Sequence, residues 1–143
     1  MLKKAFVNGE EIPREAVQHE FDRLARLYSE NGMSAEELKK NVGKLLAQAQ
    51  EQAVGAKLLL LRASELGMTP DELVEKTCAG TPDPGEREME DFFSANRDAF
   101  GGAAFVQVQT KIRDFLRHAA RGKVLAAFIA ELRERAKVEY RDS

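Results

Sequence analysis

The chain of 143 residues is 43% hydrophobic and 32% charged, which is enough apolar material for a folded core and too much for a disordered chain. Its 22 basic and 24 acidic residues nearly cancel, which argues against a general attraction to nucleic acid or to anionic membranes. One cysteine, two histidines and no tryptophan exclude an internal disulfide framework and a multi-cysteine metal site, and these counts argue against an enzyme.

Short strand patterns lie at both ends of the chain. Lys4–Val7 is followed by Asn8-Gly9, a turn-forming dipeptide, and then by Glu10–Ile12. Near the other end, Lys137–Arg141 alternates polar and apolar residues, as a half-buried strand does. Because neither strand would be stable alone, we expect the two ends of the chain to pair in one small sheet.

Between these ends, apolar residues recur with helical spacing, and the helix boundaries are clearly marked. Ser34 and Thr69 each begin a capping-box pattern, and Gly32 and Gly67 are suitable stops for the helices before them. A further helix start is predicted at Asp83-Pro84, with the proline in the first helical position. We therefore expect five helices, over about Pro13–Asn31, Ser34–Leu66, Pro70–Cys78, Pro84–Ala99 and Phe105–Ala136.

Two of these helices are long for so short a chain. At a rise of about 1.5 Å per residue, a helix over Ser34–Leu66 would reach roughly 50 Å, longer than a compact domain of this size is wide. The predicted fold class is therefore mainly α. We expect an open bundle of about five helices with long arms, together with the small sheet that pairs the two ends.

Charge is distributed unevenly along the second half of the chain. Thr69–Asp98 holds nine acidic and three basic residues, and Lys111–Arg141 holds nine basic and four acidic residues. These blocks carry about −6 and +5, so we expect them to dock against each other. The basic block lacks an Arg/Lys cluster interleaved with aromatic residues, so we interpret it as a solvated helix face and expect no nucleic-acid partner.

No residue pattern typical of an active site occurs in the chain. Phosphate-binding and dinucleotide-binding glycine motifs are absent, as are Gly-x-Ser-x-Gly and His-Glu-x-x-His. Cys78 is interpreted as a structural thiol, and His19 and His118 as members of exposed helix-face ion pairs. We therefore predict no catalytic residues, no metal ligands and no cofactor.

The long helices cannot bury all their apolar positions against one another, which leaves adaptable Met and Phe side chains for contacts with a partner. One hypothesis is a non-enzymatic chaperone that holds unfolded polypeptides. The alternative is a structural or interaction module whose apolar surface is buried in a homodimer. Any one of these side chains could equally be ordinary core. The candidate client-binding residues are Met89, Phe92, Phe93, Phe100, Phe105 and Phe115.

Four segments resemble those of the SurA/PpiC-type chaperones, the parvulin-linked folding factors of the bacterial envelope. Phe6–Ile12 is similar to the start of the mature family members, and Gln52–Met68 to their long helix that ends in Glu-Leu-Gly. Glu86–Phe100 resembles the acidic helix before their isomerase domain, and Thr110–Tyr140 the helix and terminal strand after it. The order and spacing of the segments cover nearly the whole chain. The resemblance implies a fold like the SurA N-terminal domain and the C-terminal domain of trigger factor.

The chain departs from that family at one place. Family members carry a parvulin domain between these last two segments, whereas here only Gly101-Gly102-Ala103-Ala104 joins Phe100 to Phe105. The resemblance therefore implies one chaperone domain over residues 1–143 without isomerase activity, whose partners are unfolded or extended client polypeptides. The short Gly101-Gly102 hinge also favours a homodimer in which the flanking helices swap between two copies.

The resemblance implies a place in the periplasm or cell envelope. No apolar signal segment follows Lys3-Lys4, so a chain complete as written would be cytoplasmic. The longest apolar run, Leu58–Leu61, is far shorter than the about 20 residues that a bilayer span needs, so we expect no membrane insertion.

Overall fold

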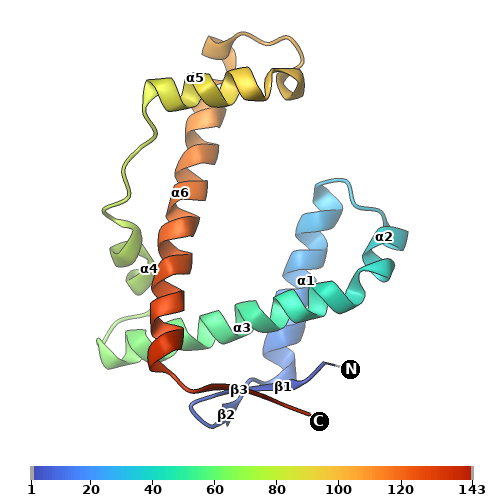
Figure 1. Cartoon of the computed structure of the whole chain (residues 1–143), viewed down its shortest axis with the longest axis vertical. Coiled ribbons are helices and arrows are strands. Elements are labelled where there is room, and N and C mark those ends of the chain that lie inside the picture. Colours follow the sequence, from blue (N-terminus) through green and yellow to red (C-terminus); the bar gives the residue numbers. More distant parts are fainter. Residues whose placement is uncertain (1, 143) are drawn as a thin grey trace. The chain divides into compact units, whose positions relative to one another are not determined.

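The structure, a computed structural model, describes residues 2–142. Over this range it contains six α-helices, one short 3-10 helix and a three-stranded antiparallel sheet (Figure 1). The prediction of a mainly helical fold with a small sheet is confirmed, with six helices where about five were expected. The chain forms two compact units: the first unit is Met1–Leu73 with Ile129–Ser143, and the second unit is Val74–Phe128.

The sheet belongs to the first unit and joins the two ends of the chain (Figure 1). Its strands are β1 (Lys4–Val7), β2 (Glu10–Glu11) and β3 (Val138–Arg141), in the order β2-β1-β3. Asn8 and Gly9 both have positive φ, 51° and 86°, as a two-residue type I′ hairpin turn requires. Asn8 also donates its backbone N–H to the Lys137 carbonyl at 2.7 Å and accepts the Lys137 N–H on Oδ1 at 2.9 Å. The predicted pairing of the two ends is therefore confirmed.

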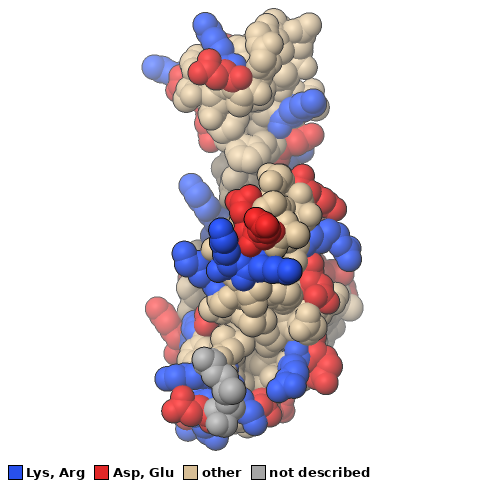
Figure 2. Space-filling view, turned by 90° about the vertical axis from the view of Figure 1, so that its right-hand side faces the viewer, with Lys and Arg blue, Asp and Glu red and all other residues tan. Residues whose placement is uncertain are grey.

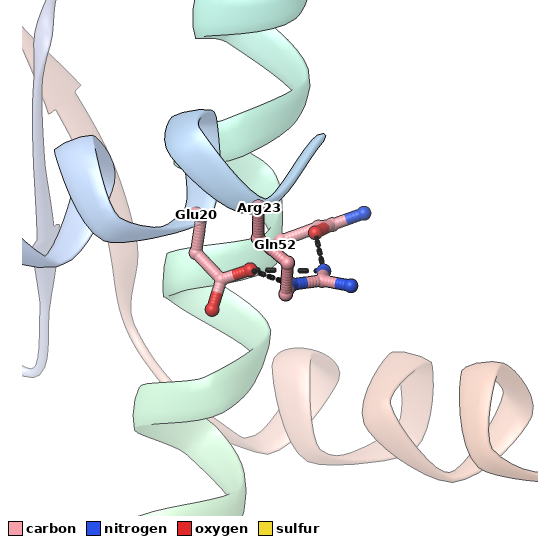
Figure 3. A network of polar contacts seen from close by, with 3 residues as sticks. All are labelled: Glu20, Arg23 and Gln52. Atoms are coloured by element: carbon pink, nitrogen blue, oxygen red, sulfur yellow. Dashed lines mark hydrogen bonds and ion pairs between the residues drawn. The ribbon is translucent and has the colours of Figure 1, made fainter. Parts of the chain in front are cut away.

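Two helices that cross each other supply most of the buried side chains of the first unit (Figure 1). They are α1 (Arg14–Glu30) and α3 (Val42–Glu65), which pack against each other. Gln52 interrupts the apolar stripe of α3, and its Oε1 accepts a hydrogen bond from Arg23 of α1 (Figure 3). Arg23 also donates to Glu20 at 2.9 and 3.1 Å, so the polar interruption is used to join the two helices. The buried apolar side chains of the first unit are Ala5, Val7, Ile12, Val17, Leu24, Leu45, Ala49, Ala53, Val54, Leu58, Leu59, Ala63, Leu73 and Leu132.

The predicted helix stops and starts around Gly32 and Gly67 are confirmed. Both glycines adopt positive φ, 101° and 68°, and in each case the next residue closes a Schellman-type hydrogen bond to a carbonyl of the last helical turn. Capping boxes begin at Ser34 and at Thr69, each with reciprocal bonds to the Glu three residues later.

The prediction of one continuous helix over Ser34–Leu66 is wrong. The chain forms α2 (Ala35–Lys40), breaks at Asn41, and starts again as α3. Asn41 leaves the helical region, with φ −108° and ψ 13°, and its side-chain amide donates to the Glu37 carbonyl at 2.7 Å. The Glu37 carbonyl also accepts the backbone N–H of Asn41 at 3.1 Å, so both donors of Asn41 share one acceptor at the point where α2 ends.

The predicted helix over Pro84–Ala99 is wrong at both ends. Its regular part is α5 (Glu86–Ala95), with Gly85 as N-cap, and a 3-10 helix η1 (Arg97–Phe100) follows Asn96. At the start, Asp83 accepts a hydrogen bond from Arg117 at 2.8 Å, and Gly85 takes the capping position without a side-chain bond. At the end, the Asn96 amide donates to the Phe92 carbonyl at 2.9 Å, as Asn41 does in the first unit.

The other three helices agree with the predictions, and α1 begins and ends one residue inside the predicted Pro13–Asn31. α4 (Pro70–Cys78) has the predicted bounds, and α6 (Phe105–Arg135) ends one residue before the predicted end. Within the second unit, the acidic and basic blocks meet through Arg117–Asp83 at 2.8 Å and Arg121–Glu75 at 3.1 Å. These two ion pairs agree with the expected docking of the blocks.

Candidate functional site

A tight turn in the second unit folds η1 back onto the start of α6. Gly101 and Gly102 lie in the left-handed region, with φ 57° and 84°, where a residue without a side chain is least strained. The Ala103 N–H donates to the Phe100 carbonyl at 3.0 Å. The side chain of Gln107 then accepts the Ala104 N–H at 2.8 Å, which satisfies a donor at the start of α6.

This turn brings five phenylalanines together on α5, η1 and α6. We call them the aromatic patch: Phe92, Phe93, Phe100, Phe105 and Phe115. Their rings form one continuous series of contacts, with centroid distances of 5.2 Å (Phe115–Phe92), 6.4 Å (Phe92–Phe100), 5.4 Å (Phe100–Phe93) and 5.6 Å (Phe93–Phe105). Aromatic pairs at such separations attract one another beyond the burial of their surface.

A small buried core lies against the aromatic patch. It consists of Met89 from α5 with Val108 and Ile112 from α6, and Leu116 packs against it. Met89 is only 3% exposed, so its side chain offers almost no surface to a partner. Of the six predicted client-binding residues, Met89 therefore supports the patch, and the five phenylalanines form it.

The patch is only partly shielded from water. Phe115 is 58% exposed, and the other four phenylalanines are half-buried. The guanidinium group of Arg97 lies 5.8 Å from the centre of the Phe93 ring and borders the patch with a cation–π contact. In Figure 2, uncharged surface gathers over the end of the second unit that carries α5, with charges along its border. The arrangement suits contacts with apolar side chains.

A second group of polar residues, in the first unit, was not predicted from the sequence. Arg133 of α6 donates to Glu51 of α3 at 2.6 Å and also to the hydroxyl oxygen of Tyr140 in β3, and that hydroxyl donates to Glu51. Burial by itself would raise the pKa of Glu51. The hydrogen bonds from Tyr140 and Arg133 and the charge of Arg133 outweigh burial and hold the pKa below its ordinary value. Burial and the hydrogen bond to Glu51 raise the pKa of Tyr140.

This network predicts a pH dependence of stability. A lowered pKa means that folding favours the Glu51 carboxylate, so its contribution is present above the ordinary pKa of 4.5 and is lost as the pH falls through the lower folded value. Glu51→Gln should therefore reduce the difference in melting temperature between pH 7 and pH 3. Because the Glu51 side chain is half exposed, we expect a loss at pH 7 of no more than about 1 kcal/mol.

The matched control is Glu30→Gln, which removes an equal charge from an exposed residue that makes no ion pair within residues 2–142. Thermal melts followed by circular dichroism give the melting temperatures of the wild type, Glu51→Gln and Glu30→Gln at pH 7 and pH 3. If both variants changed the difference in melting temperature between pH 7 and pH 3 by the same amount, a specific role for the network would be contradicted.

Other chemistry-bearing residues lie apart from one another. Cys78 is buried, and its sulfur lies 3.7 Å from the Arg121 carbonyl oxygen. In the part of the chain that the structure describes, no three His, Cys, Asp or Glu side chains are grouped so that they could hold a metal ion. No helix of residues 2–142 is long and apolar enough to cross a bilayer.

Comparison with known proteins gives no relative for this arrangement. No family model matches the chain, and neither a curated protein nor a solved structure matches it.

Proposed function

We propose that this chain is a non-enzymatic chaperone that holds unfolded or extended polypeptides on the aromatic patch. The observation that carries the proposal is the continuous series of five phenylalanine rings that stays half-open to water over a buried core of three side chains. Isolated apolar side chains are common on protein surfaces, whereas contiguous apolar surface typically marks a site of interaction.

The chemistry of the patch suits weak binding to many sequences. Phenylalanine rings make large, non-directional contacts, so an extended client can satisfy them with any apolar side chain that it carries. Part of the contact energy is lost in ordering the client, and we expect affinities near micromolar, or about −8 kcal/mol. Release would then follow from weak affinity and from folding of the client.

The resemblance to SurA/PpiC-type chaperones supports the same function. On this proposal residues 1–143 are one chaperone domain, with the turn at Gly101–Ala104 in the place of the parvulin domain, and the protein works in the periplasm or cell envelope. The tight closure of that turn between η1 and α6 supports a chaperone without an isomerase domain. The chain should then leave the rate of a proline-limited refolding reaction unchanged, and acceleration of that reaction would contradict a purely non-enzymatic role.

The decisive substitution is Phe115→Ser, because Phe115 is the most exposed ring of the patch and its loss should leave the buried core intact. Light scattering of a chemically denatured client on dilution measures suppression of aggregation. We expect the wild type to suppress scattering, and the variant to need about five to ten times more protein for the same effect, since it loses one large apolar contact.

The matched control is Val106→Ser, which changes an apolar residue of the same helix that is 80% exposed and makes none of the ring contacts of the patch. It should suppress scattering as the wild type does. Equal activity of Phe115→Ser and wild type would contradict client binding on the patch. Failure of the wild type to suppress scattering, together with a dimer mass in place of 16.0 kDa, would favour the homodimeric module instead.

A further inference from the structure

One edge of the three-stranded sheet has no neighbouring strand. The strand order is β2-β1-β3, so β3 is the last strand on its side of the sheet. No other strand of residues 2–142 pairs with it, and it leads from the end of α6 to the C-terminus (Figure 1). An edge strand presents a row of unpaired backbone donors and acceptors, which makes it a template for a strand from another chain.

The hydrogen bonds on the paired side show which backbone groups of β3 are free. Lys137, the residue before β3, bonds through its carbonyl oxygen and its N–H to the turn after β1. Because hydrogen-bonded pairs recur at every second residue of an antiparallel ladder, Glu139 and Arg141 direct their backbone groups toward β1. Val138 and Tyr140 direct theirs away from it, and these groups bond to no other residue within 2–142.

Side-chain contacts hold β3 in place. The hydroxyl group of Tyr140 is bonded to Arg133 of α6 and to Glu51 of α3, and the guanidinium group of Arg141 lies 4.4 Å from the centre of the Phe6 ring. The free edge is therefore ordered in the single chain, which reduces the entropy that is lost when a further strand is added.

Charged side chains on a strand edge usually oppose pairing with a second copy, but those of β3 match in one antiparallel register. Lys137, Glu139 and Arg141 alternate in sign along one face, with Glu139 3.7 Å from Lys137 and 3.2 Å from Arg141. If a two-fold axis passes through Tyr140, Glu139 of each copy lies opposite Arg141 of the other. Opposite charges then face each other at two places, which favours this register.

Two neighbouring registers are unfavourable. An axis through Glu139 would place this residue opposite its own counterpart and Lys137 opposite Arg141, so that like charges meet. An axis through Val138 would pair Tyr140 with the residue at position 136, directly after α6, where the chain is not yet extended. The charges and the end of α6 therefore select the same axis, through Tyr140.

We propose that two copies of this chain associate through β3 and form one continuous sheet in the order β2-β1-β3-β3-β1-β2. Tyr140 pairs with Tyr140 of the second copy, and Val138 with Asp142, which forms about six backbone hydrogen bonds. A two-fold interface of this kind uses up the free edge of both copies, so assembly stops at the dimer. The inference does not rest on the proposed function, because β3 contains no residue of the aromatic patch. It also differs from a helix swap at Gly101-Gly102, because each copy keeps its own fold.

Sedimentation velocity of the full chain tests the association. A pairing of two short strands buries little surface, so we expect a weak dimer that forms between about 5 and 500 μM. The mass should rise over this range from 16.0 kDa toward twice that value. Glu139→Arg places like charges opposite each other and should weaken the dimer at least tenfold or so, by about 1.4 kcal/mol or more. A monomer over the whole range, or a wild-type dimer that Glu139→Arg leaves unchanged, would overturn the proposal.

Mixing two variants separates a lost contact from a damaged fold. Arg141→Glu alone should also be monomeric, whereas an equimolar mixture of Glu139→Arg and Arg141→Glu should dimerise again, because arginines of one copy then face glutamates of the other. The matched control is Glu30→Arg, the same charge change at an exposed residue outside the sheet, which should dimerise as the wild type does. No recovery in the mixture, equal weakening by the control, or loss of the dimer in Phe115→Ser would contradict pairing through β3.

Oxidative crosslinking tests the register. A mixture of Glu139→Cys and Arg141→Cys should form a disulfide-linked dimer, because residues opposite each other in a non-hydrogen-bonded pair lie about 4.5 Å apart at Cα. Glu139→Cys alone should not, and the wild type, whose Cys78 is buried, is the control. Crosslinking of Glu139→Cys alone, or none in the mixture, would overturn the pairing about Tyr140.

Discussion

Removal of residues 137–143 is expected to lower the melting temperature by about 10 °C or more. The deletion takes away β3, which pairs with all four residues of β1, from Lys4 opposite Arg141 to Val7 opposite Val138. Without it, β1 retains only two residue pairs with β2, and Val7, which is fully buried, would gain exposure to water. A two-stranded hairpin this short is marginally stable at best.

The size of this effect follows from the contacts that are lost. Several backbone hydrogen bonds at about 1 kcal/mol each, together with partial exposure of a buried valine at about 1.5–3 kcal/mol, amount to roughly 3–5 kcal/mol. For a chain of this length each kcal/mol shifts the melting temperature by a few degrees. Differential scanning calorimetry measures the shift directly.

The control for this deletion is a shorter one. Removing only residues 142 and 143 leaves β3 intact and takes away the ion pair of Lys3 with Asp142, which spans 4.0 Å between exposed side chains. Such a pair contributes little, so the melting temperature should change by no more than about 2 °C. If the longer deletion melted like this control, the pairing of the chain ends would not stabilise the first unit.

The sequence predicted the elements well where local chemistry decides them. The Asn8-Gly9 turn, the stops at Gly32 and Gly67 and the capping box at Thr69 each depend on residues within one turn of the chain. The three-strand sheet was predictable as well, because strands too short to persist alone must pair. Neither its strand order nor its register could be read from the sequence, since both depend on how the helices bring the chain ends together.

The helix breaks at Asn41 and Asn96 were missed because apolar periodicity continues across them. In both cases, and at Asn31, the side-chain amide donates to the carbonyl four residues earlier, at 2.7 to 2.9 Å. The three asparagines have φ between −96° and −119° and ψ between 13° and 24°, outside the regular helix. An asparagine in a helical pattern is therefore a stop signal in this chain that periodicity alone does not reveal.

The candidate residues of the second unit could be selected from the sequence, since all six are apolar and lie on neighbouring helices. The sequence could not separate the buried Met89 from the exposed Phe115, because that distinction depends on how α5 meets α6. Long-range polar contacts were not predictable. Glu51 lies 82 residues from Arg133, and Gln50 lies 47 residues from Lys3, in a chain with many equivalent charged and polar side chains.

Ile112→Ala is expected to destabilise the second unit strongly. Ile112 is 1% exposed and lies in a buried core that otherwise contains only Met89 and Val108. Removing a buried isoleucine costs about 2–5 kcal/mol, and so small a core has few other contacts to compensate for the cavity. Because four of the five phenylalanines of the aromatic patch, all except Phe115, pack against this core, the substitution should also loosen their rings.

Hydrogen exchange can measure the loss of stability in each unit separately, since backbone amides report local as well as global opening. In Ile112→Ala the amides of α5 should exchange faster by a larger factor than those of β1, which belongs to the first unit. Val106→Ala is the control, because it shortens an exposed valine on the same helix and should leave exchange within about twofold of the wild type. Equal acceleration in α5 and β1 would show that the two units unfold as one, and unchanged exchange in α5 would show that Ile112 does not hold the patch in place.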